Sequence, residues 1–211
     1  MPAMLEAHQL ACQRGDRLLF RRLELAVTPG EMLRIAGANG MGKTSLLRLL
    51  AGLSQPAAGA VSWLGDDIQR QRESFHAAML YLGHAPALND LLTPAENLRF
   101  ACAAGATTAS PAACTEALSR IGLQRQLALP CKVLSQGQRR RVGLARLFLE
   151  AQRPLWILDE PFTALDAAAI TDLAATLDAH CAAGGSVIFT SHQDVALRTP
   201  VRLLDVEAFS R

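Results

Sequence analysis

Short apolar stretches bounded by turn residues recur along the first part of the chain. Residues 4–10 and 18–27 alternate apolar and polar side chains and predict two strands around a polar turn at 14–16. The apolar run Met32–Ala36 predicts a third strand that leads directly into a glycine-rich loop. A helix is expected to follow at Thr44–Ala51. Strand, glycine loop and helix therefore come in immediate succession.

The rest of the chain alternates strands with helices. Thr93, Pro94 and Glu96 form a capping-box pattern with proline at the first helical position, which marks a helix start. Further strands are predicted at Ala60–Leu64, Ala78–Leu82, Leu155–Leu158 and Ser186–Thr190, and a turn at 65–67. Helices are predicted at 94–104, 111–121 and 167–181, and another is capped by Ser135 and continues through 139–149. This alternation favours an α/β fold with a parallel sheet. The two helices within about 88–130 predict a small helical lobe inserted into that core.

Composition narrows the class of protein. The 211 residues suit a single domain, half of them are hydrophobic, and the net charge of +2 gives no sign of a nucleic-acid-binding tail. No apolar run approaches the roughly 20 residues that span a bilayer, and the N-terminal residues lack a signal-peptide pattern, so we expect a cytoplasmic chain. The five cysteines include no C-x-x-C pair, which argues against zinc and against a disulfide framework.

The glycine-rich loop carries the first chemical motif. The segment G-A-N-G-M-G-K-T fits the phosphate-loop pattern G-x-x-x-x-G-K-[ST]. The predicted nucleotide-binding residues are Gly37, Ala38, Asn39, Gly40, Met41, Gly42, Lys43, Thr44 and Ser45. Lys43 is expected to contact the β- and γ-phosphates, and Thr44 to give its hydroxyl to Mg²⁺. The cofactors are therefore predicted to be ATP and Mg²⁺.

A second motif supplies two acids. The apolar strand Leu155–Leu158 runs into Asp159 and Glu160. The carboxyl end of such a strand is where α/β sheets place their ligands. Asp159 is predicted to hold Mg²⁺, and Glu160 to orient or polarise the attacking water as a catalytic residue.

Three further motifs follow in a fixed order. The string L-S-Q-G-Q at 134–138 is followed by F-T-A-L-D, which ends at Asp166, and later by Ser191-His192. With the phosphate loop and the two acids, this order resembles the ATP-binding subunits of ATP-binding cassette (ABC) transporters. The resemblance implies a P-loop ABC-type ATPase core over 1–211, with a parallel sheet, an N-terminal antiparallel β lobe and the inserted helical lobe.

The same resemblance assigns further roles. Ser135, Gln136, Gly137 and Gln138 would form the signature that binds the nucleotide of a second copy of the chain, joined head-to-tail. A helix N-terminus suits that task because its free N–H groups attract anions. Asp166 would lie in the loop that crosses the dimer interface, and His192 would sense the γ-phosphate as a catalytic residue.

Two positions depart from the usual family pattern. His84 stands where a glutamine usually couples the nucleotide site to the membrane partner, and histidine can still donate or accept a hydrogen bond. Arg14 stands near the place of the aromatic residue that stacks on adenine, and a guanidinium can also stack on a ring. The run Arg139–Arg141 is expected to form a solvated helix face or, alternatively, part of the dimer interface.

Within ABC proteins, the segments Y-L-G-H-A-P-A-L and L-L-T-P-A-E-N-L-R-F resemble the ATP-binding subunits of cytochrome c maturation systems. This implies a peripheral subunit at the cytoplasmic face of the bacterial inner membrane, bound to integral-membrane permease subunits, in heme export or delivery. Heme itself is not expected to bind this chain, and no nucleic acid is expected as a partner. Three alternatives stay open: transport of another substrate, an ATP-driven switch that releases a heme chaperone without transport, and a soluble ABC protein of DNA repair or translation.

Overall fold

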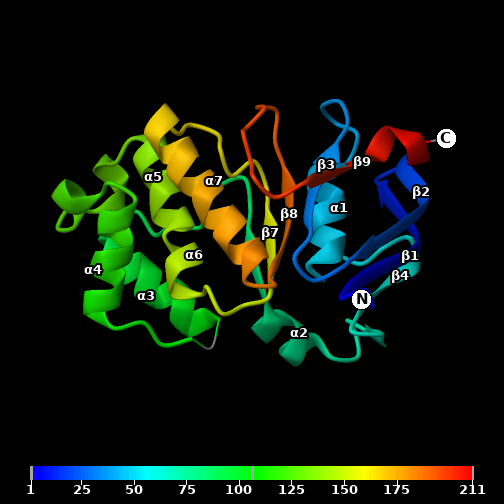
Figure 1. Cartoon of the computed structure of the whole chain (residues 1–211), viewed down its shortest axis with the longest axis horizontal. Helices are drawn as coiled ribbons and strands as arrows, with labels where there is room; N and C mark the ends of the chain where they lie inside the picture. Colours follow the sequence, from blue (N-terminus) through cyan, green and yellow to red (C-terminus); the bar gives the residue numbers. More distant parts are fainter. Residues whose placement is uncertain (1, 106, 211) are drawn as a thin grey trace.

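Two sheets form the centre of the computed structural model, which describes residues 2–105 and 107–210 (Figure 1). The strands are β1 (Leu5–Arg14), β2 (Arg17–Val27), β3 (Met32–Ala36), β4 (Ala58–Trp63), β5 (Asp66–Asp67), β6 (Met79–Leu82), β7 (Leu155–Leu158), β8 (Ser186–Thr190) and β9 (Val201–Asp205). The helices are α1 (Lys43–Leu50), α2 (Arg72–Ala78), α3 (Pro94–Ala104), α4 (Pro111–Arg120), α5 (Gln136–Leu144), α6 (Arg146–Leu149) and α7 (Ala167–Ala182), with short 3₁₀ turns at Gln124–Gln126, Cys131–Val133 and Val206–Phe209.

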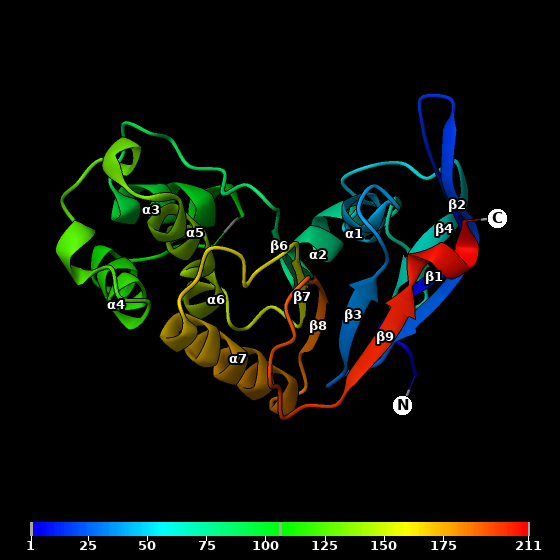
Figure 2. The same cartoon turned by 90° about the horizontal axis from the view of Figure 1, so that it is seen from above.

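The smaller sheet is antiparallel and contains the N-terminal strands. Its order is β2-β1-β4-β5, and β1 pairs antiparallel with both β2 and β4. The turn end of the β1–β2 hairpin projects beyond the rest of the molecule (Figure 2). The predicted N-terminal antiparallel lobe is confirmed.

The larger sheet is parallel and has the order β6-β7-β8-β3-β9. Helix α1 lies between the two sheets, where its leucines share one apolar core with residues of β1 and β3. Helix α7 covers the opposite face, and its Leu173 and Leu177 pack with Trp156 and Phe189 of the sheet. The sheet therefore has helices on both faces, as its continuous apolar strands require.

A helical lobe lies to one side of the sheets (Figure 1). Helices α3 and α4 pack on α5 and α6 around a separate apolar core that includes Leu98, Leu118, Leu123 and Val142. Helix α3 begins at Thr93 with the predicted capping box, in which Thr93 and Glu96 satisfy each other's backbone N–H groups. The predicted α/β fold with an inserted helical lobe is confirmed.

Four local details differ from the sequence prediction. Asp66 and Asp67 pair with β4, because the turn lies one residue earlier, at Leu64-Gly65, where both residues have positive φ as in a type I′ turn. Helix α2 and strand β9 were not predicted. The helix expected to run to Leu149 is interrupted at Ala145, whose φ of −59° and ψ of −20° are typical of a 3₁₀ turn.

All five cysteines are buried, and none of them forms a disulfide. Burial raises the pKa of Cys102 and that of Cys181 to about 11. Within the described residues, none of the helices combines the length and apolar character that a membrane crossing requires.

Candidate active site

A glycine-rich loop joins β3 to α1. Gly37, Gly40 and Gly42 have φ values of 133°, 80° and 98°, a backbone region that side chains with a Cβ rarely adopt. A Cβ on Gly42 would also lie 3.2 Å from the Leu19 side chain. The Lys43 ammonium group donates to the carbonyl oxygen of Gly37 at 2.7 Å and so lies against the loop. The loop thus combines close-packed backbone, a helix N-terminus and a lysine, which together suit a phosphate group.

Asp159, the first acid after β7, connects the phosphate loop to the sheet through hydrogen bonds. Asp159 is almost fully buried. Its carboxylate accepts a hydrogen bond from the Thr44 hydroxyl at 2.8 Å and another from the Thr190 hydroxyl at 2.7 Å. Thr44 and Asp159 therefore present two oxygen ligands side by side, of the kind that Mg²⁺ prefers.

The second acid has an unusual backbone conformation. Glu160 has a φ of +52°, which costs about 1–3 kcal/mol in a residue with a side chain and persists only where the surroundings fix it. Its N–H donates to the Thr190 hydroxyl at 2.8 Å. Its carboxylate accepts from the backbone N–H of His192 at 3.3 Å and lies 3.5 Å from the His192 Nε2. The glutamate and the histidine are therefore next to each other at the end of the sheet.

These groups line one pocket of about 590 Å³. Its lining residues are Arg14, Arg17, Leu19, Asn39, Gly40, Gly42, Lys43, Thr44, Ser45, His84, Asp159, Glu160, Thr163, His192 and Gln193. The structure thus brings together residues from the predicted phosphate loop, both acids, His84, His192 and Arg14. None of the described Tyr, Phe or Trp side chains is part of the lining.

The predicted signature residues lie elsewhere. Ser135 is the N-cap of α5 and forms a reciprocal capping box with Gln138. None of the residues at 135–138 lines the nucleotide pocket of the same chain. A Cβ on Gly137 would lie 2.6 Å from the carbonyl oxygen of Ala164, so α5 starts directly against the loop before α7. Asp166 ends that loop as the N-cap of α7, where it accepts from the N–H of Ala169 and pairs with Arg141.

The expectation that the run Arg139–Arg141 forms a solvated helix face is wrong. Arg139 pairs with Asp90 at 2.6 Å, and Arg141 pairs with Asp166. Arg140 is buried, with 7% of its surface exposed. All three side chains have partners within the chain.

Three residues of the site were missed in the sequence. Arg140 donates to the backbone carbonyl oxygens of Asp159 and Glu160, and Thr190 bonds both of these acids. Glu207 accepts from the N–H of Ala38 in the loop at 2.5 Å. The sequence does not single out Arg140, because Arg139 and Arg141 also have apolar residues three positions later, at Val142 and Leu144.

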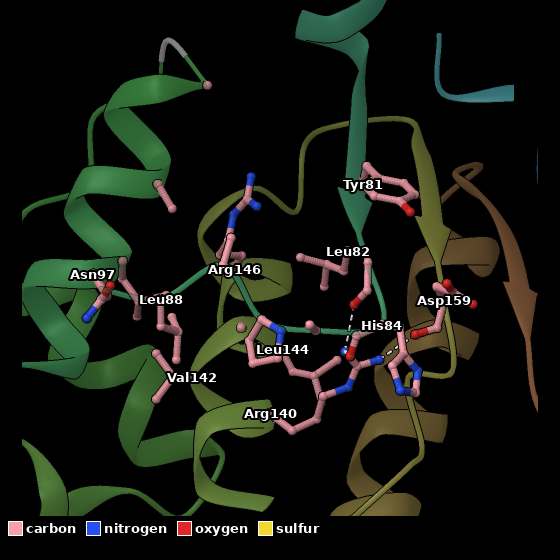
Figure 3. A pocket seen from close by; sticks show the side chains of 18 of the residues that line it. Tyr81, Leu82, His84, Leu88, Asn97, Arg140, Val142, Leu144, Arg146 and Asp159 are labelled. Atoms are coloured by element: carbon pink, nitrogen blue, oxygen red, sulfur yellow. Dashed lines mark hydrogen bonds between the residues drawn. The ribbon is translucent and has the colours of Figure 1, made fainter. Parts of the chain in front are cut away.

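His84 links this pocket to a second one. The second pocket, of about 650 Å³, lies between the helical lobe and the sheet and is also lined by His84, Thr44 and Asp159 (Figure 3). Its wall on the lobe side includes Phe100 of α3, which is 71% exposed. Any group that fills the second pocket would therefore contact residues of the first.

The fold and the pocket define a P-loop nucleotide-binding protein with two acidic residues, Asp159 and Glu160, beside the phosphate loop. The family profile described as ABC transporter matches residues 20–163. The sequence is 66% identical over 203 residues to the cytochrome c biogenesis ATP-binding export protein CcmA of Aromatoleum aromaticum, covering 96% of this chain and 95% of that relative. It is 49% identical to the protein of the same name from Methylococcus capsulatus, covering 97% of this chain and 98% of the other.

Solved structures agree with this result. A structure described as the ATP-binding subunit of an ABC transporter has a TM-score of 0.79 and 29% identity, and the match covers 90% of this chain and 79% of that one. A dimeric, post-hydrolysis ATP-binding cassette bound to ADP and Pi has the same TM-score at 22% identity, over 90% of this chain and 88% of the other. The chain belongs to the ABC transporter family and, within it, to the family of cytochrome c biogenesis ATP-binding export proteins. It is an ATP-binding and ATP-hydrolysing subunit.

Proposed function

We propose that this protein supplies ATP-driven work to a membrane complex that exports or delivers heme for c-type cytochrome biogenesis. The observation that carries the proposal is the 66% identity to a cytochrome c biogenesis ATP-binding export protein across 96% of the chain. The pocket that brings together Lys43, Thr44, Asp159, Glu160 and His192 supports the ATP-driven part of the proposal. The protein would act at the cytoplasmic face of the inner membrane as a peripheral subunit.

Each group in the pocket has a task in hydrolysis. The N–H groups of the loop at 37–45 and the Lys43 ammonium group would hold the phosphates, and Arg14 would lie against the base. Glu160 would orient the water that attacks the γ-phosphorus, and His192 would bond the γ-phosphate. The short distance between Glu160 and His192 supports their joint action on one reacting group. Hydrolysis of ATP then gives ADP and phosphate.

The chemistry of Thr44 and Asp159 fits a magnesium ion. Their two oxygens lie 2.8 Å apart, and the described residues contain no cluster of three or more His, Cys, Asp or Glu side chains that could hold a metal alone. Mg²⁺ typically keeps water and substrate phosphate among its ligands, so a site with two protein oxygens suits it. When bound, the ion would neutralise charge on the phosphates.

A second copy of the chain would complete the site. The signature at 135–138 begins a helix whose N-terminus can bind an anion, yet none of its residues lines the chain's own pocket. Two chains joined head-to-tail would place each signature on the partner's nucleotide. The related ATP-binding cassette with ADP and Pi is described as dimeric, which supports this arrangement.

The membrane partner would bind at the second pocket. The position of His84 in the lining of both pockets would let the partner respond to the nucleotide. The exposed Phe100 offers an apolar contact on the lobe side.

The proposal is tested first with Glu160→Gln, measured beside the exposed control Glu73→Gln on α2. The amide keeps the shape of the side chain but loses its charge, so the variant should bind Mg·ATP normally and lose at least about 100-fold in kcat. The control should hydrolyse ATP like the wild type. Wild-type turnover in Glu160→Gln would contradict the role of Glu160.

The second test is mass spectrometry of proteins that co-purify with the tagged chain from native membranes in mild detergent. Recovery of small multi-span proteins together with a heme chaperone would support the proposal. Recovery of an unrelated permease would keep the ABC assignment and contradict the heme role.

A further inference from the structure

The strongest unexplained feature of the site is the buried guanidinium of Arg140. Its Nη1 donates to the carbonyl oxygens of Gly83 and His84, both at 2.7 Å. Its Nη2 donates to the carbonyl oxygens of Asp159 and Glu160, at 2.5 Å and 2.8 Å. Figure 3 shows the side chain between the loop that carries His84 and the end of β7 at Asp159.

These four acceptors belong to two segments that the sheet no longer joins. The ladder between β6 and β7 ends where the N–H of Asp159 donates to the carbonyl oxygen of Leu82 at 2.8 Å. Beyond that bond both strands have left the sheet, and Arg140 supplies the connection between them. Only arginine offers enough donors in one rigid plane to bond all four carbonyls.

The guanidinium of Arg140 carries a charge as well as a set of donors. Burial lowers the pKa of Arg140, and the carboxylates of Asp159 and Glu160 act in the opposite direction and favour its charged form. An arginine guanidinium stays charged in proteins, so Arg140 places a positive charge close to the two acids. No described carboxylate forms an ion pair with it, so its bonds are all to backbone oxygens that fix chain geometry.

The backbone that Arg140 holds is the strained one. Glu160 has positive φ, and two contacts fix its peptide groups: Thr190 bonds its N–H, and Arg140 bonds its carbonyl oxygen. Without one of these hydrogen bonds, the positive φ of Glu160 would lose part of its support, and the backbone would relax toward an ordinary conformation. The carboxylate beside His192 would then move.

We propose that Arg140 is a positioning residue that holds Glu160 and the His84 loop in one geometry and links both to the signature helix. Arg140 lies on α5, whose first residues are the signature at 135–138. The inference rests on the proposed function in one respect, the contact of that signature with the partner's ATP. A shift of α5 when its signature contacts the partner's ATP would move Arg140, and with it the acids and the His84 loop of its own chain. The two nucleotide sites of the dimer would therefore be coupled.

The test compares Arg140→Gln and Arg140→Lys with the control Arg139→Gln. Arg139 is the preceding residue on α5 and contacts Asp90 and the Cys131 carbonyl rather than the acids. Steady-state ATPase kinetics, Mg·ATP affinity and thermal unfolding are measured for all three. A displacement of about 1 Å in a reacting group can cost about 100-fold in rate, so Arg140→Gln should lose about 10- to 100-fold in kcat.

The pattern of effects separates positioning from plain stabilisation. KM and Mg·ATP affinity should change less than about threefold in Arg140→Gln, because the phosphate loop is untouched, and Arg140→Lys should regain part of kcat by bonding some of the carbonyls. Arg139→Gln should match the wild type in kcat. If Arg140→Gln also lowers thermal stability, Arg140→Lys, which keeps the charge, still tests the proposal.

Two results would overturn the inference: unchanged kcat in both Arg140 variants, or equal losses of kcat in Arg139→Gln and Arg140→Gln. Either would leave the proposed ATPase role intact, because that role fails only if Glu160→Gln keeps its turnover.

Discussion

Thr190→Val removes one hydroxyl group that fixes both acids of the site. The Thr190 side chain is fully buried in β8, accepts from the N–H of Glu160 and donates to the carboxylate of Asp159. Valine has nearly the same shape, so the change leaves no cavity but leaves the Glu160 N–H without a partner. A hydrogen bond to a charged group contributes about 1.5–3 kcal/mol, and a buried N–H without a partner costs about 1–3 kcal/mol.

The two terms share one hydroxyl and are not additive, so we expect a loss of about 3 kcal/mol in the free energy of unfolding. With an m-value near 3 kcal/mol/M, the midpoint of urea unfolding should fall by about 1 M. Because Glu160 also loses an anchor of its strained backbone, kcat should fall at least about tenfold.

The assay is urea unfolding followed by circular dichroism, with ATPase kinetics on the same preparations. Thr190→Ser is the matched control, because it keeps the hydroxyl and loses only a methyl group. It should retain most of the stability and turnover. A Thr190→Val protein with an unchanged midpoint and unchanged kcat would refute the reasoning that this hydroxyl holds the acids in place.

Two further predictions follow from close contacts elsewhere in the fold. Gly137→Ala should lower both stability, by about 1–3 kcal/mol, and ATP-dependent dimerisation, because its Cβ would lie 2.6 Å from the Ala164 carbonyl oxygen. Gly143→Ala on the same helix meets only an ordinary 3.5 Å contact and should not destabilise; equal effects of the two changes in thermal unfolding would contradict the prediction. Burial lowers the pKa of His180, which stacks on Trp156, from 6.5 to about 4. The unfolded chain binds that proton more readily, so this contribution to stability is complete above pH 6.5 and is lost as the pH falls toward 4. His180→Phe should flatten the pH dependence of unfolding in this window, and an unchanged slope would count against it.

The elements with local signals were predicted closely from sequence. The strand Met32–Ala36, the phosphate loop and the helix after it depend on residues that are adjacent in the chain. The helix that starts at Pro94 was predicted because Thr93 and Glu96 cap it within one turn. Placement of Asp159 and Glu160 at the edge of the sheet followed from the rule that parallel strands carry their ligand residues at the carboxyl ends, whereas His192 was assigned from the family resemblance.

The missed elements lack such signals. Helix α2 has seven residues, no side-chain cap and a single buried residue, Phe75. Strand β9 is an edge strand with a mostly exposed face, so its side chains show little of the pattern of a buried strand. Both depend on long-range contacts for their stability.

The buried role of Arg140 could not be predicted from the arginine run itself. Its four acceptors are backbone oxygens, which every residue has, and they come from segments far apart in the chain. Thr190 and Glu207 are similar, because each acts on the loop or the acids through contacts that only the folded chain creates.

The most direct test of the central claim is the amount of covalently bound heme in the c-type cytochromes of cells that lack the native protein. The cells are complemented with the wild-type chain or with Glu160→Gln, and both proteins are quantified in the membrane fraction. The account predicts that the wild-type chain restores c-type cytochromes, whereas Glu160→Gln reaches the membrane at the same level and does not. Restoration by Glu160→Gln, or normal c-type cytochromes without the protein, would contradict it.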